Sequence, residues 1–296
     1  MPDLSVIVPS VNGFGDLDGC LTALEAQRAD VDLEVIVVDR LGADLTSRVR
    51  SSFPWARIVE VEPAATIPQM RAVGFAAATA PAIGVIEDHV LVREGWAKQM
   101  LAALASGATV VGGPIENAAT NTLMDWASFL CEYSHCIPPL PEGRVDWLPG
   151  NNVVYTRKVL DANAAIIAEH KWENRLHDAI RDSGTPLVCR PEIVADHKKH
   201  FTFGEYMSQR YLYSRSYAGA RVRGAPLTKK LAYAVGSLVL PPVLFLRTVS
   251  RIRAKDRHQA ELKRSLPYIA FFVVAWAAGE FVGYVAGAGD SLSKVT

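Results

Sequence analysis

The chain of 296 residues has few cysteines, and no two of its four, Cys20, Cys131, Cys136 and Cys189, form a Cys-x-x-Cys pair. This scarcity excludes a disulfide framework and a cysteine zinc site, and it is typical of reduced thiols in a cytosolic protein. The chain also lacks internal repeats and low-complexity tracts, which excludes a repeat architecture. Since the apolar run Leu4–Val8 begins almost at the first residue, we expect no signal peptide.

The chain has no excess of charge of either sign, because 31 Lys and Arg residues balance 31 Asp and Glu residues. The balance hides an uneven distribution. Residues 1–196 carry 15 basic and 26 acidic residues, whereas residues 197–264 carry 15 basic and only 3 acidic ones. This pattern predicts an acidic body followed by a basic belt that docks on an anionic membrane face. Nucleic acid is the rival partner of such a belt, but the neighbouring apolar runs favour lipid.

Long apolar runs are rare and lie near the C-terminus. Residues 267–289 are about 23 residues long with one acid, Glu280, which is enough to span a bilayer. Glu280 would need a partner there, and an oligomer contact is one answer. A second segment, 231–248, has an apolar run that ends at Leu246 and is broken by Pro241 and Pro242. It suits a re-entrant hairpin better than a span.

The distribution of basic residues bears on this topology. The stretch Arg247–Arg264 holds seven Lys and Arg residues and should therefore stay cytoplasmic. One re-entrant segment followed by one span satisfies that condition. Two spans stay open as an alternative, because the residues before Leu231 are also basic.

The first 200 residues alternate short apolar runs with segments of helical spacing. The predicted strands include Leu4–Val8, Leu33–Val38, Arg57–Val61, Ala82–Ile86, Thr109–Val111 and the extended piece Glu192–Ala195. The predicted helices include Leu17–Ala26, Gln69–Ala78, Trp96–Ala105, Lys158–Ala168 and Arg175–Asp182. This repetition predicts an α/β domain over residues 1–200 with a mainly parallel sheet covered by helices on both faces. An amphipathic interface segment over 201–226 and a membrane-associated helical region over 227–296 follow.

Three side chains that can bind a metal, Glu87, Asp88 and His89, leave the C-terminal end of the apolar run Ala82–Ile86. In an open α/β sheet that end is where ligands bind. Two carboxylates and an imidazole suit a divalent cation, and a cation there suits a substrate with phosphates. Asp39 ends another apolar strand in the same way, where it either caps a turn or accepts hydrogen bonds from a nucleobase or ribose.

Five motifs in order resemble those of the inverting family 2 glycosyltransferases, which have a GT-A fold. The resemblance covers about residues 4–215. The motifs are Val6–Asn12, Val37–Asp39, Glu87–His89 followed by Gly95 and Trp96, Leu148–Asn152, and Trp172 with Glu173. The third motif resembles the DxD segment that holds the metal and diphosphate. The resemblance therefore implies a GT-A catalytic domain that is Rossmann-like.

The resemblance also implies a role for each matching residue. Glu173 would be the catalytic base. The nucleotide-sugar would lie against Pro9, Val11, Asn12, Asp39, Arg71, Glu87 and Asp88. The acceptor side would comprise Gly150, Asn151, Asn152, Trp172, Gln209 and Arg210. The metal ligands would be Asp88, His89 and His197.

Four departures from the family pattern matter. His89 stands where a second aspartate is usual, and because an imidazole suits Mg²⁺ poorly, Mn²⁺ is the expected cofactor and Mg²⁺ the alternative. Glu173 stands where an aspartate is usual, and Trp172 replaces an acidic neighbour. Arg40 follows Asp39 where a second acid is common, which leaves the nucleobase open.

The expected function is transfer of a sugar from a UDP- or GDP-linked donor to a lipid-linked or membrane-proximal glycan acceptor. The enzyme would lie at the cell membrane with its catalytic domain in the cytoplasm, in contact with lipids and not with nucleic acid. A non-catalytic sugar-nucleotide-binding or scaffold protein of the same fold is the alternative. A nucleotidyltransferase would want a lysine in the loop after the first strand, and Val11–Gly15 has none.

Overall fold

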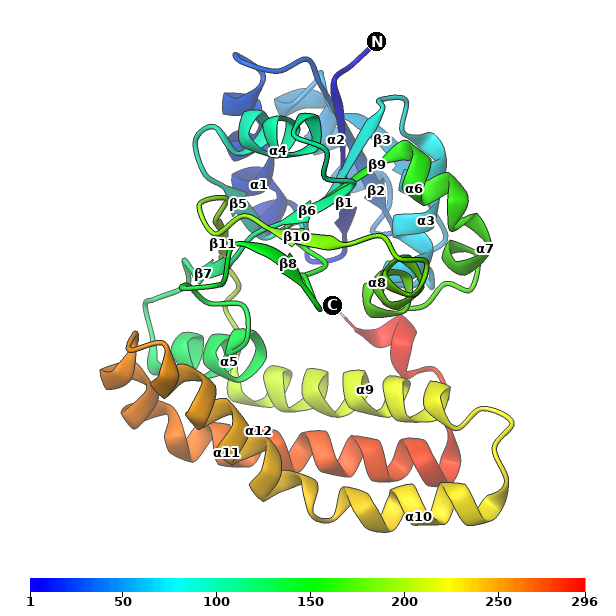
Figure 1. Cartoon of the computed structure of the whole chain (residues 1–296), viewed down its shortest axis with the longest axis vertical. Helices are drawn as coiled ribbons and strands as arrows, with labels where there is room; N and C mark the ends of the chain where they lie inside the picture. The colour runs from blue at the N-terminus through cyan, green and yellow to red at the C-terminus, as the bar shows by residue number, and fades with distance from the viewer. Residues whose placement is uncertain (296) are drawn as a thin grey trace. The chain divides into compact units, whose positions relative to one another are not determined.

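The computed structural model describes residues 1–295 and divides the chain into two compact units (Figure 1). The first, called here the α/β unit, holds residues 1–118 and 136–198. The second, called the helical unit, holds residues 119–135 and the chain from Lys199 onward. The division after Lys198 falls close to the boundary expected at residue 200. The assignment of residues 119–135 to the helical unit was not expected from the sequence.

The α/β unit is built on an eight-stranded sheet in the order β3-β2-β1-β4-β9-β6-β10-β8. In chain order its strands are β1 (Leu4–Ser10), β2 (Leu33–Asp39), β3 (Arg57–Glu60), β4 (Ala82–Val85), β6 (Val110–Gly112), β8 (Gly143–Val145), β9 (Val153–Thr156) and β10 (Leu187–Cys189). Strands β3, β2, β1 and β4 run parallel, while β9 is antiparallel to both β4 and β6. The mainly parallel α/β architecture is thus confirmed, with an antiparallel strand in its middle.

A second, three-stranded sheet has the order β5-β11-β7. Its strands are β5 (Val90–Val92), β7 (Ile115–Asn117) and β11 (Ala195–His197). The extended piece predicted over Glu192–Ala195 therefore begins as a strand only at Ala195. This shift places His197 within the strand, paired with Val90 of β5.

Helices cover both faces of the large sheet. They are α1 (Phe14–Gln27), α2 (Ala43–Ser52), α3 (Ile67–Ala77), α4 (Trp96–Ala105), α6 (Arg157–Ala162), α7 (Ala164–Ile167) and α8 (Glu173–Asp182). Alternate residues of a strand point to opposite faces. Accordingly Ile7 of β1 contacts α3, since a Cβ on Gly74 would lie 2.3 Å from it. Val6 faces α4, since a Cβ on Gly84 would meet Val6 at 3.6 Å and Trp96 at 3.4 Å.

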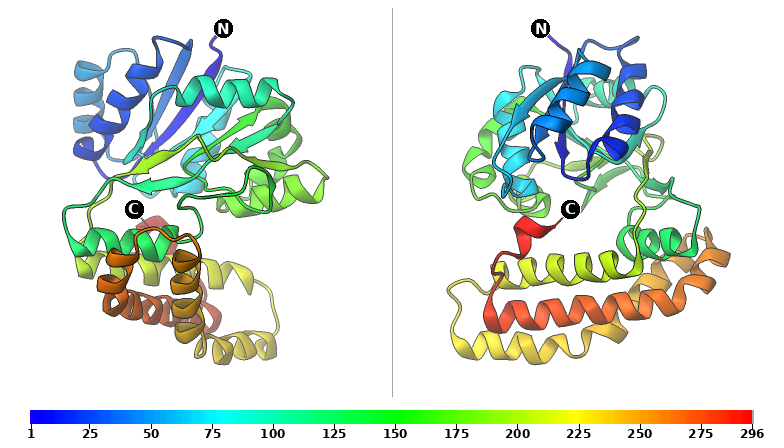
Figure 2. Two further views of the ribbon diagram at one scale, coloured as in Figure 1. Left: turned by 60° about the vertical axis from the view of Figure 1, so that its left-hand side comes forward. Right: turned by 180° about the vertical axis from the view of Figure 1, so that it is seen from behind.

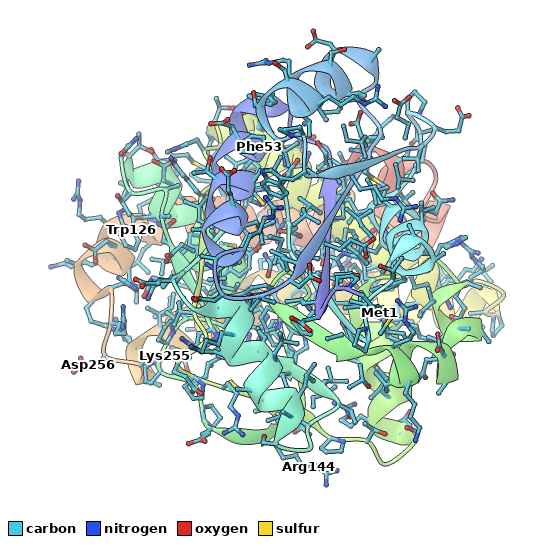
Figure 3. The ribbon with its side chains drawn as sticks, turned by 90° about the horizontal axis from the view of Figure 1, so that it is seen from above. Met1, Phe53, Trp126, Arg144, Lys255 and Asp256 are labelled. Carbon is cyan, nitrogen blue, oxygen red and sulfur yellow. The ribbon has the colours of Figure 1, made fainter. Side chains whose placement is uncertain are left out.

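The helical unit consists of α5 (Leu123–Tyr133), α9 (Phe203–Arg221), α10 (Leu227–Ser237), α11 (Leu240–Ala254), α12 (Gln259–Ala286) and a short 3₁₀ helix, η1 (Ser291–Lys294). Helix α12 packs along α9 and also contacts α5, α10 and α11 (Figure 2). The turn that joins α11 to α12 holds Lys255 and Asp256, which are labelled in Figure 3. The unit is therefore a bundle built around α12.

The two apolar segments predicted near the C-terminus form helices. Within residues 1–295, α12 alone is long and apolar enough to cross a membrane, while α10 and α11 pass that test only together and are bent by 56°. Pro241 and Pro242 start α11 at its first turn, where a missing N–H costs little. The break between α10 and α11 therefore precedes the prolines.

Candidate functional site

The site lies where parallel strands of the α/β unit end. Strand β1 ends at Ser10, β2 at Asp39 and β4 at Val85, so the segments that follow gather at one edge of the sheet. Glu87, Asp88 and His89 leave β4 at this edge, as the sequence predicted. The edge is where open α/β sheets bind ligands.

Asp88 is fully buried and joins the loop after β1 to His89. Its Oδ2 accepts the backbone N–H groups of Val11 at 2.8 Å and Asn12 at 2.9 Å. Its Oδ1 accepts from the Asn12 side chain at 2.7 Å and from His89 Nδ1 at 2.9 Å. Burial alone would raise the pKa of Asp88, but these hydrogen bonds outweigh it and hold that pKa below its usual value. Asp88 is therefore an ionised anchor.

His89 is held in one orientation by Asp88. Because the carboxylate can only accept, Nδ1 of His89 carries a proton, which leaves Nε2 as the nitrogen that could bind a metal. That Nε2 lies 2.9 Å from His197 Nε2 and 3.4 Å from Glu87 Oε2. A histidine whose second nitrogen is fixed by a carboxylate is the usual arrangement behind a metal ligand.

Glu87, His89 and His197 together form a group whose ligand atoms all lie within 4.8 Å of one another. The pairing of β11 with β5 brings His197 to His89, and Lys198 N donates to His89 O at 2.9 Å. The expected ligand set was Asp88, His89 and His197. The structure places Glu87 in this group. Asp88 instead accepts a hydrogen bond from Nδ1 of His89, and both of its oxygens already accept hydrogen bonds. One carboxylate with two imidazoles suits Mn²⁺ better than Mg²⁺.

Arg71 links this group to Glu173. The arginine projects from α3 and is buried, with Nη1 2.7 Å from Glu173 Oε2 and Nη2 3.5 Å from Glu87 Oε1. Desolvation would lower the pKa of Arg71, but Glu173 and Glu87 outweigh it and raise that pKa. Asn151 donates to Glu87 Oε2 at 2.9 Å. Two predicted residues, Arg71 and Asn151, thus hold the two carboxylates on which the predicted chemistry depends.

The segment Leu148–Asn152 contributes in two ways. Gly150 passes so close to Glu173 that a Cβ there would lie 2.5 Å from Glu173 Cδ, so any larger residue would displace the Glu173 side chain. Asn152 is fully buried, accepts from Trp96 Nε1 at 2.8 Å and donates to Pro114 O at 3.0 Å and Ile193 O at 2.9 Å. It therefore ties three segments of the unit together.

Asp39 and its neighbours line the end of β2. Asp39 is buried and accepts from Leu41 N at 2.8 Å and Gly42 N at 3.0 Å, which is the turn-capping alternative considered from the sequence. Arg40 is also buried and donates to Ala65 O at 2.9 Å. Pro9 pairs with Val38 within the sheet.

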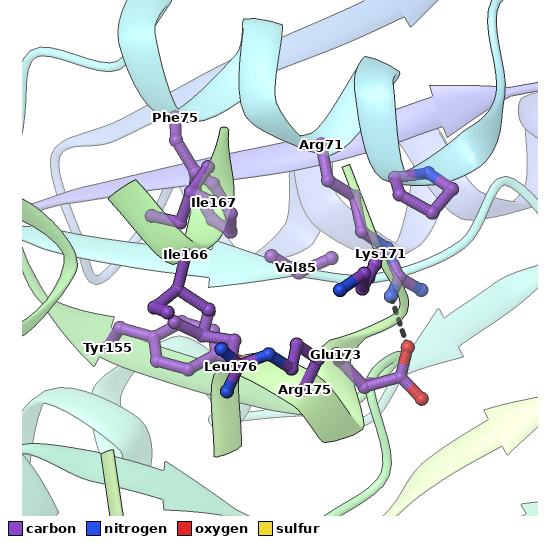
Figure 4. Close-up of a pocket in the computed structure, with 12 residues that line it drawn as sticks. Arg71, Phe75, Val85, Tyr155, Ile166, Ile167, Lys171, Glu173, Arg175 and Leu176 are labelled. Atoms are coloured by element: carbon purple, nitrogen blue, oxygen red, sulfur yellow. Dashed lines mark hydrogen bonds and ion pairs between the residues drawn. The ribbon is translucent and has the colours of Figure 1, made fainter. Parts of the chain in front are cut away.

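A pocket opens beside Arg71 and Glu173, between α3, α7 and α8 (Figure 4). Its apolar wall consists of Pro68, Phe75, Val85, Tyr155, Ile166, Ile167 and Leu176. Lys171 and Arg175 also line it, and both pair with Glu169. With room for about two water molecules, it is too small for a sugar ring. The sequence showed no sign of this pocket, because its lining comes from distant segments.

The remaining predicted residues are Trp172, Gln209 and Arg210. Trp172 is buried at the N-terminus of α8, with the Arg71 guanidinium 5.9 Å from its ring centre. Gln209 and Arg210 belong to α9 of the helical unit. There Arg210 is buried and pairs with Glu132 at 3.0 Å.

The family model described as glycosyl transferase family 2 matches residues 5–154, just over half of the chain. The chain belongs to this family. It is therefore a glycosyltransferase, and the family predicted from the five motifs is confirmed. The matched range includes Asp39, Arg71 and the segment Glu87–His89, whereas Glu173 and His197 lie beyond it.

The glycosyltransferase resembles the crystal structure of S. aureus TarS 1-349, with a TM-score of 0.53 and 14% sequence identity. The alignment covers 96% of this chain and 92% of that chain. At this identity the likeness shows the fold, and the expected GT-A fold is confirmed. No curated protein matches the chain.

Proposed function

We propose that this glycosyltransferase is metal-dependent and inverting, with Glu173 as its general base. The observation that carries the proposal is the link, through Arg71, between the Glu173 carboxylate and the group formed by Glu87, His89 and His197. Inverting transfer needs a carboxylate that takes the proton of the acceptor hydroxyl. This carboxylate must lie close to a group that stabilises the negative charge of the departing diphosphate. Both features meet at the edge of the sheet.

In the proposed reaction Glu173 takes the proton of an acceptor hydroxyl. The acceptor oxygen forms a bond to the anomeric carbon of the donor sugar from the face opposite the diphosphate. The bond from that carbon to the phosphate oxygen breaks, and the nucleoside diphosphate leaves with the electron pair. A divalent cation held by Glu87, His89 and His197 would stabilise the negative charge of the diphosphate. Asp88 keeps His89 in the orientation that this requires.

The substrates are proposed from the same site and from the chain's charge pattern. The donor is a UDP- or GDP-linked sugar whose nucleoside lies near Asp39 and Arg40, at the end of β2. The acceptor is a lipid-linked or membrane-proximal glycan. The basic belt over 197–264 and the apolar helix α12 support a place on the cytoplasmic face of the cell membrane.

Calorimetry of the full chain with UDP and GDP, each with Mn²⁺, with Mg²⁺ and with a chelator, tests the metal site. We expect Mn²⁺-dependent binding that weakens by at least about tenfold in His89→Ala and His197→Ala. Asp88→Asn should cost about tenfold to a hundredfold, the usual loss when the residue behind a ligand is changed. His170→Asn is the matched control, since His170 is exposed in the same unit. Equal binding with and without chelator in every protein would refute the metal site.

A further inference from the structure

Helix α9 covers the apolar part of α12 along its length. Near the start of α9 and the middle of α12, the ring centres of Tyr206 and Phe272 are 4.5 Å apart. Near their ends a Cβ on Gly219 would lie 2.1 Å from Ala288 N. Between these points Gly279 of α12 has no room for a side chain against α9. The two helices therefore run in the same direction in continuous contact.

This contact decides whether α12 can span a bilayer. Helix α9 carries four charged side chains, Glu205, Arg210, Arg215 and Arg221. If α12 crossed the hydrocarbon core, α9 would cross beside it and bring these charges with it. Charged groups that cannot reach the membrane surface are costly at that depth, and Arg210 lies in the middle of α9. A span of α12 is therefore disfavoured although its length and composition allow one.

Glu280, the one acid in the apolar part of α12, also faces the protein. Glu280 accepts from Trp276 Nε1 at 3.0 Å and from Tyr284 OH at 2.6 Å. The guanidinium of Arg221, from α9, lies 3.5 Å from Glu280 Oε2. The partner that Glu280 needs is thus in the same chain, and an oligomer contact is not required to supply it.

The opposite face of α12 is exposed and apolar. Phe271, Val274, Ala278, Phe281 and Val285 are all exposed, and their spacing of three or four residues places them on one stripe. The stripe extends for about 21 Å at 1.5 Å per residue. Helix α12 therefore packs against α9 on one side, through buried side chains such as Phe272, and exposes an apolar stripe on the other.

Helices α10 and α11 add a second exposed apolar surface. Large side chains that are 50% to 66% exposed occur on both sides of the bend: Leu231, Val235, Leu238, Val239, Val243 and Leu246. Soluble monomers rarely expose so many large apolar side chains together, and such a patch marks a contact with lipid or with another protein.

The basic residues around this patch favour lipid as its partner. Exposed basic residues flank the bend on both sides, with Arg223 and Lys229 before it and Arg247, Arg253 and Arg257 after it. Both flanks are basic, so the positive-inside rule places them on the same side of the membrane. Basic residues beside an apolar patch fit the headgroups of an anionic leaflet.

We propose that the helical unit is monotopic. The bend between α10 and α11 and the exposed stripe of α12 enter one leaflet of an anionic bilayer, and α12 lies in the plane of the membrane. This proposal rests on the membrane location given under the proposed function and replaces the span predicted over 267–289. It concerns topology alone, so it can fail while the proposed reaction stands.

Cysteine labelling tests the topology. Ser250→Cys lies before α12 and Lys294→Cys after it, and both positions are exposed. The four native cysteines are buried, and the unaltered protein gives their background. With full-length protein bound to the outside of sealed vesicles, a membrane-impermeant maleimide should label both cysteines without lysis. Labelling of one before lysis and of the other only after lysis would establish a span and overturn the proposal.

Sedimentation with phosphatidylcholine and phosphatidylglycerol vesicles tests the surface. The double variant Leu231→Glu, Val235→Glu should bind at least about tenfold more weakly, because it removes two apolar anchors. Leu41→Glu, which changes an exposed apolar residue of the α/β unit, is the control and should bind normally. Unchanged binding, or a dimer in light scattering that the double variant dissociates, would show that lipid does not cover this face. Calorimetry with UDP, GDP and Mn²⁺ on the same proteins shows separately whether the donor site is intact.

Discussion

Arg71 contacts both carboxylates that the proposed chemistry uses, and this arrangement has a consequence at the scale of single residues. The guanidinium lies 2.7 Å from Glu173 and 3.5 Å from Glu87, so its charge is shared between the proposed base and a candidate metal ligand. Binding of a diphosphate and its cation would change the contacts of Arg71 with Glu173 and with Glu87 together. Arg71 is thus placed to couple donor binding to the state of the base.

His177 is buried beside Tyr155, which lines the pocket, and its protonation state can be tested through stability. It accepts a hydrogen bond from Tyr155 OH at 2.6 Å. Burial lowers the pKa of His177 from 6.5 to about 4. The folded chain therefore resists protonation that the unfolded chain accepts, so this stability is present above pH 6.5 and is lost as the pH falls toward 4.

Unfolding by urea should show this effect. Between pH 7 and pH 5 the histidine should remove about 2 kcal/mol from the free energy of unfolding. His177→Gln keeps an acceptor for Tyr155, so its loss over the same range should be smaller by that amount. The same pH dependence in both proteins would show that His177 is not neutral and buried in solution.

Sequence reasoning at this scale grouped these residues into one candidate site but did not predict which contacts each residue makes. The cluster Glu87–His89 and the distant His197 were expected to meet, and they do. That Glu87, and not Asp88, joins His89 and His197 in the candidate metal-binding group depends on the loop after β1. The backbone N–H groups of Val11 and Asn12 occupy Asp88, and no one-dimensional pattern shows that contact.

At the scale of elements, α3 positions Arg71 through close packing on β1. Gly74 lies one turn after Arg71, where a Cβ would be 2.3 Å from Ile7 Cγ2. Gly74→Ala should therefore destabilise the chain by about 1–3 kcal/mol, although alanine favours the helix itself. Denaturant unfolding with Gly15→Ala as the control checks this, because a Cβ at Gly15 meets nothing within 4 Å. Equal stability of the two variants would contradict the packing described for α3.

Element types were predictable where the periodicity was strong and short-range. Helix α4 has the predicted bounds, Trp96–Ala105, and β1, β2 and β4 differ from the prediction only at their ends. Helix α2 was not predicted, because Ala43–Ser52 is largely polar. The insertion of β9 antiparallel between β4 and β6 also could not be predicted, because pairing partners depend on long-range contacts.

At the scale of the whole molecule, the chain combines a GT-A unit with a helical unit. The boundaries of these units differ from those predicted from the sequence, because residues 119–135 belong to the helical unit. Residues 119–135 leave the α/β unit and return, so α5 belongs to the helical unit. The apolar residues of α5 are typical of any amphipathic helix. Only its contacts with α9 and α12 show that it belongs to the helical unit. Likewise, hydropathy predicted a span over 267–289, whereas the polar helix beside α12 is visible only in three dimensions.

The central claim is that Glu173 removes the acceptor proton at a metal-dependent donor site, and one variant tests it most directly. Glu173→Gln keeps the shape of the side chain and its place beside Gly150 but removes its basicity. We predict that release of nucleoside diphosphate from the bound sugar nucleotide, with membrane lipids as acceptor, falls by about 10²- to 10⁴-fold. Mn²⁺-dependent binding of UDP or GDP should be unchanged by calorimetry. A folded variant that loses binding and transfer equally, or that retains full transfer, would contradict the assignment of Glu173 as the base.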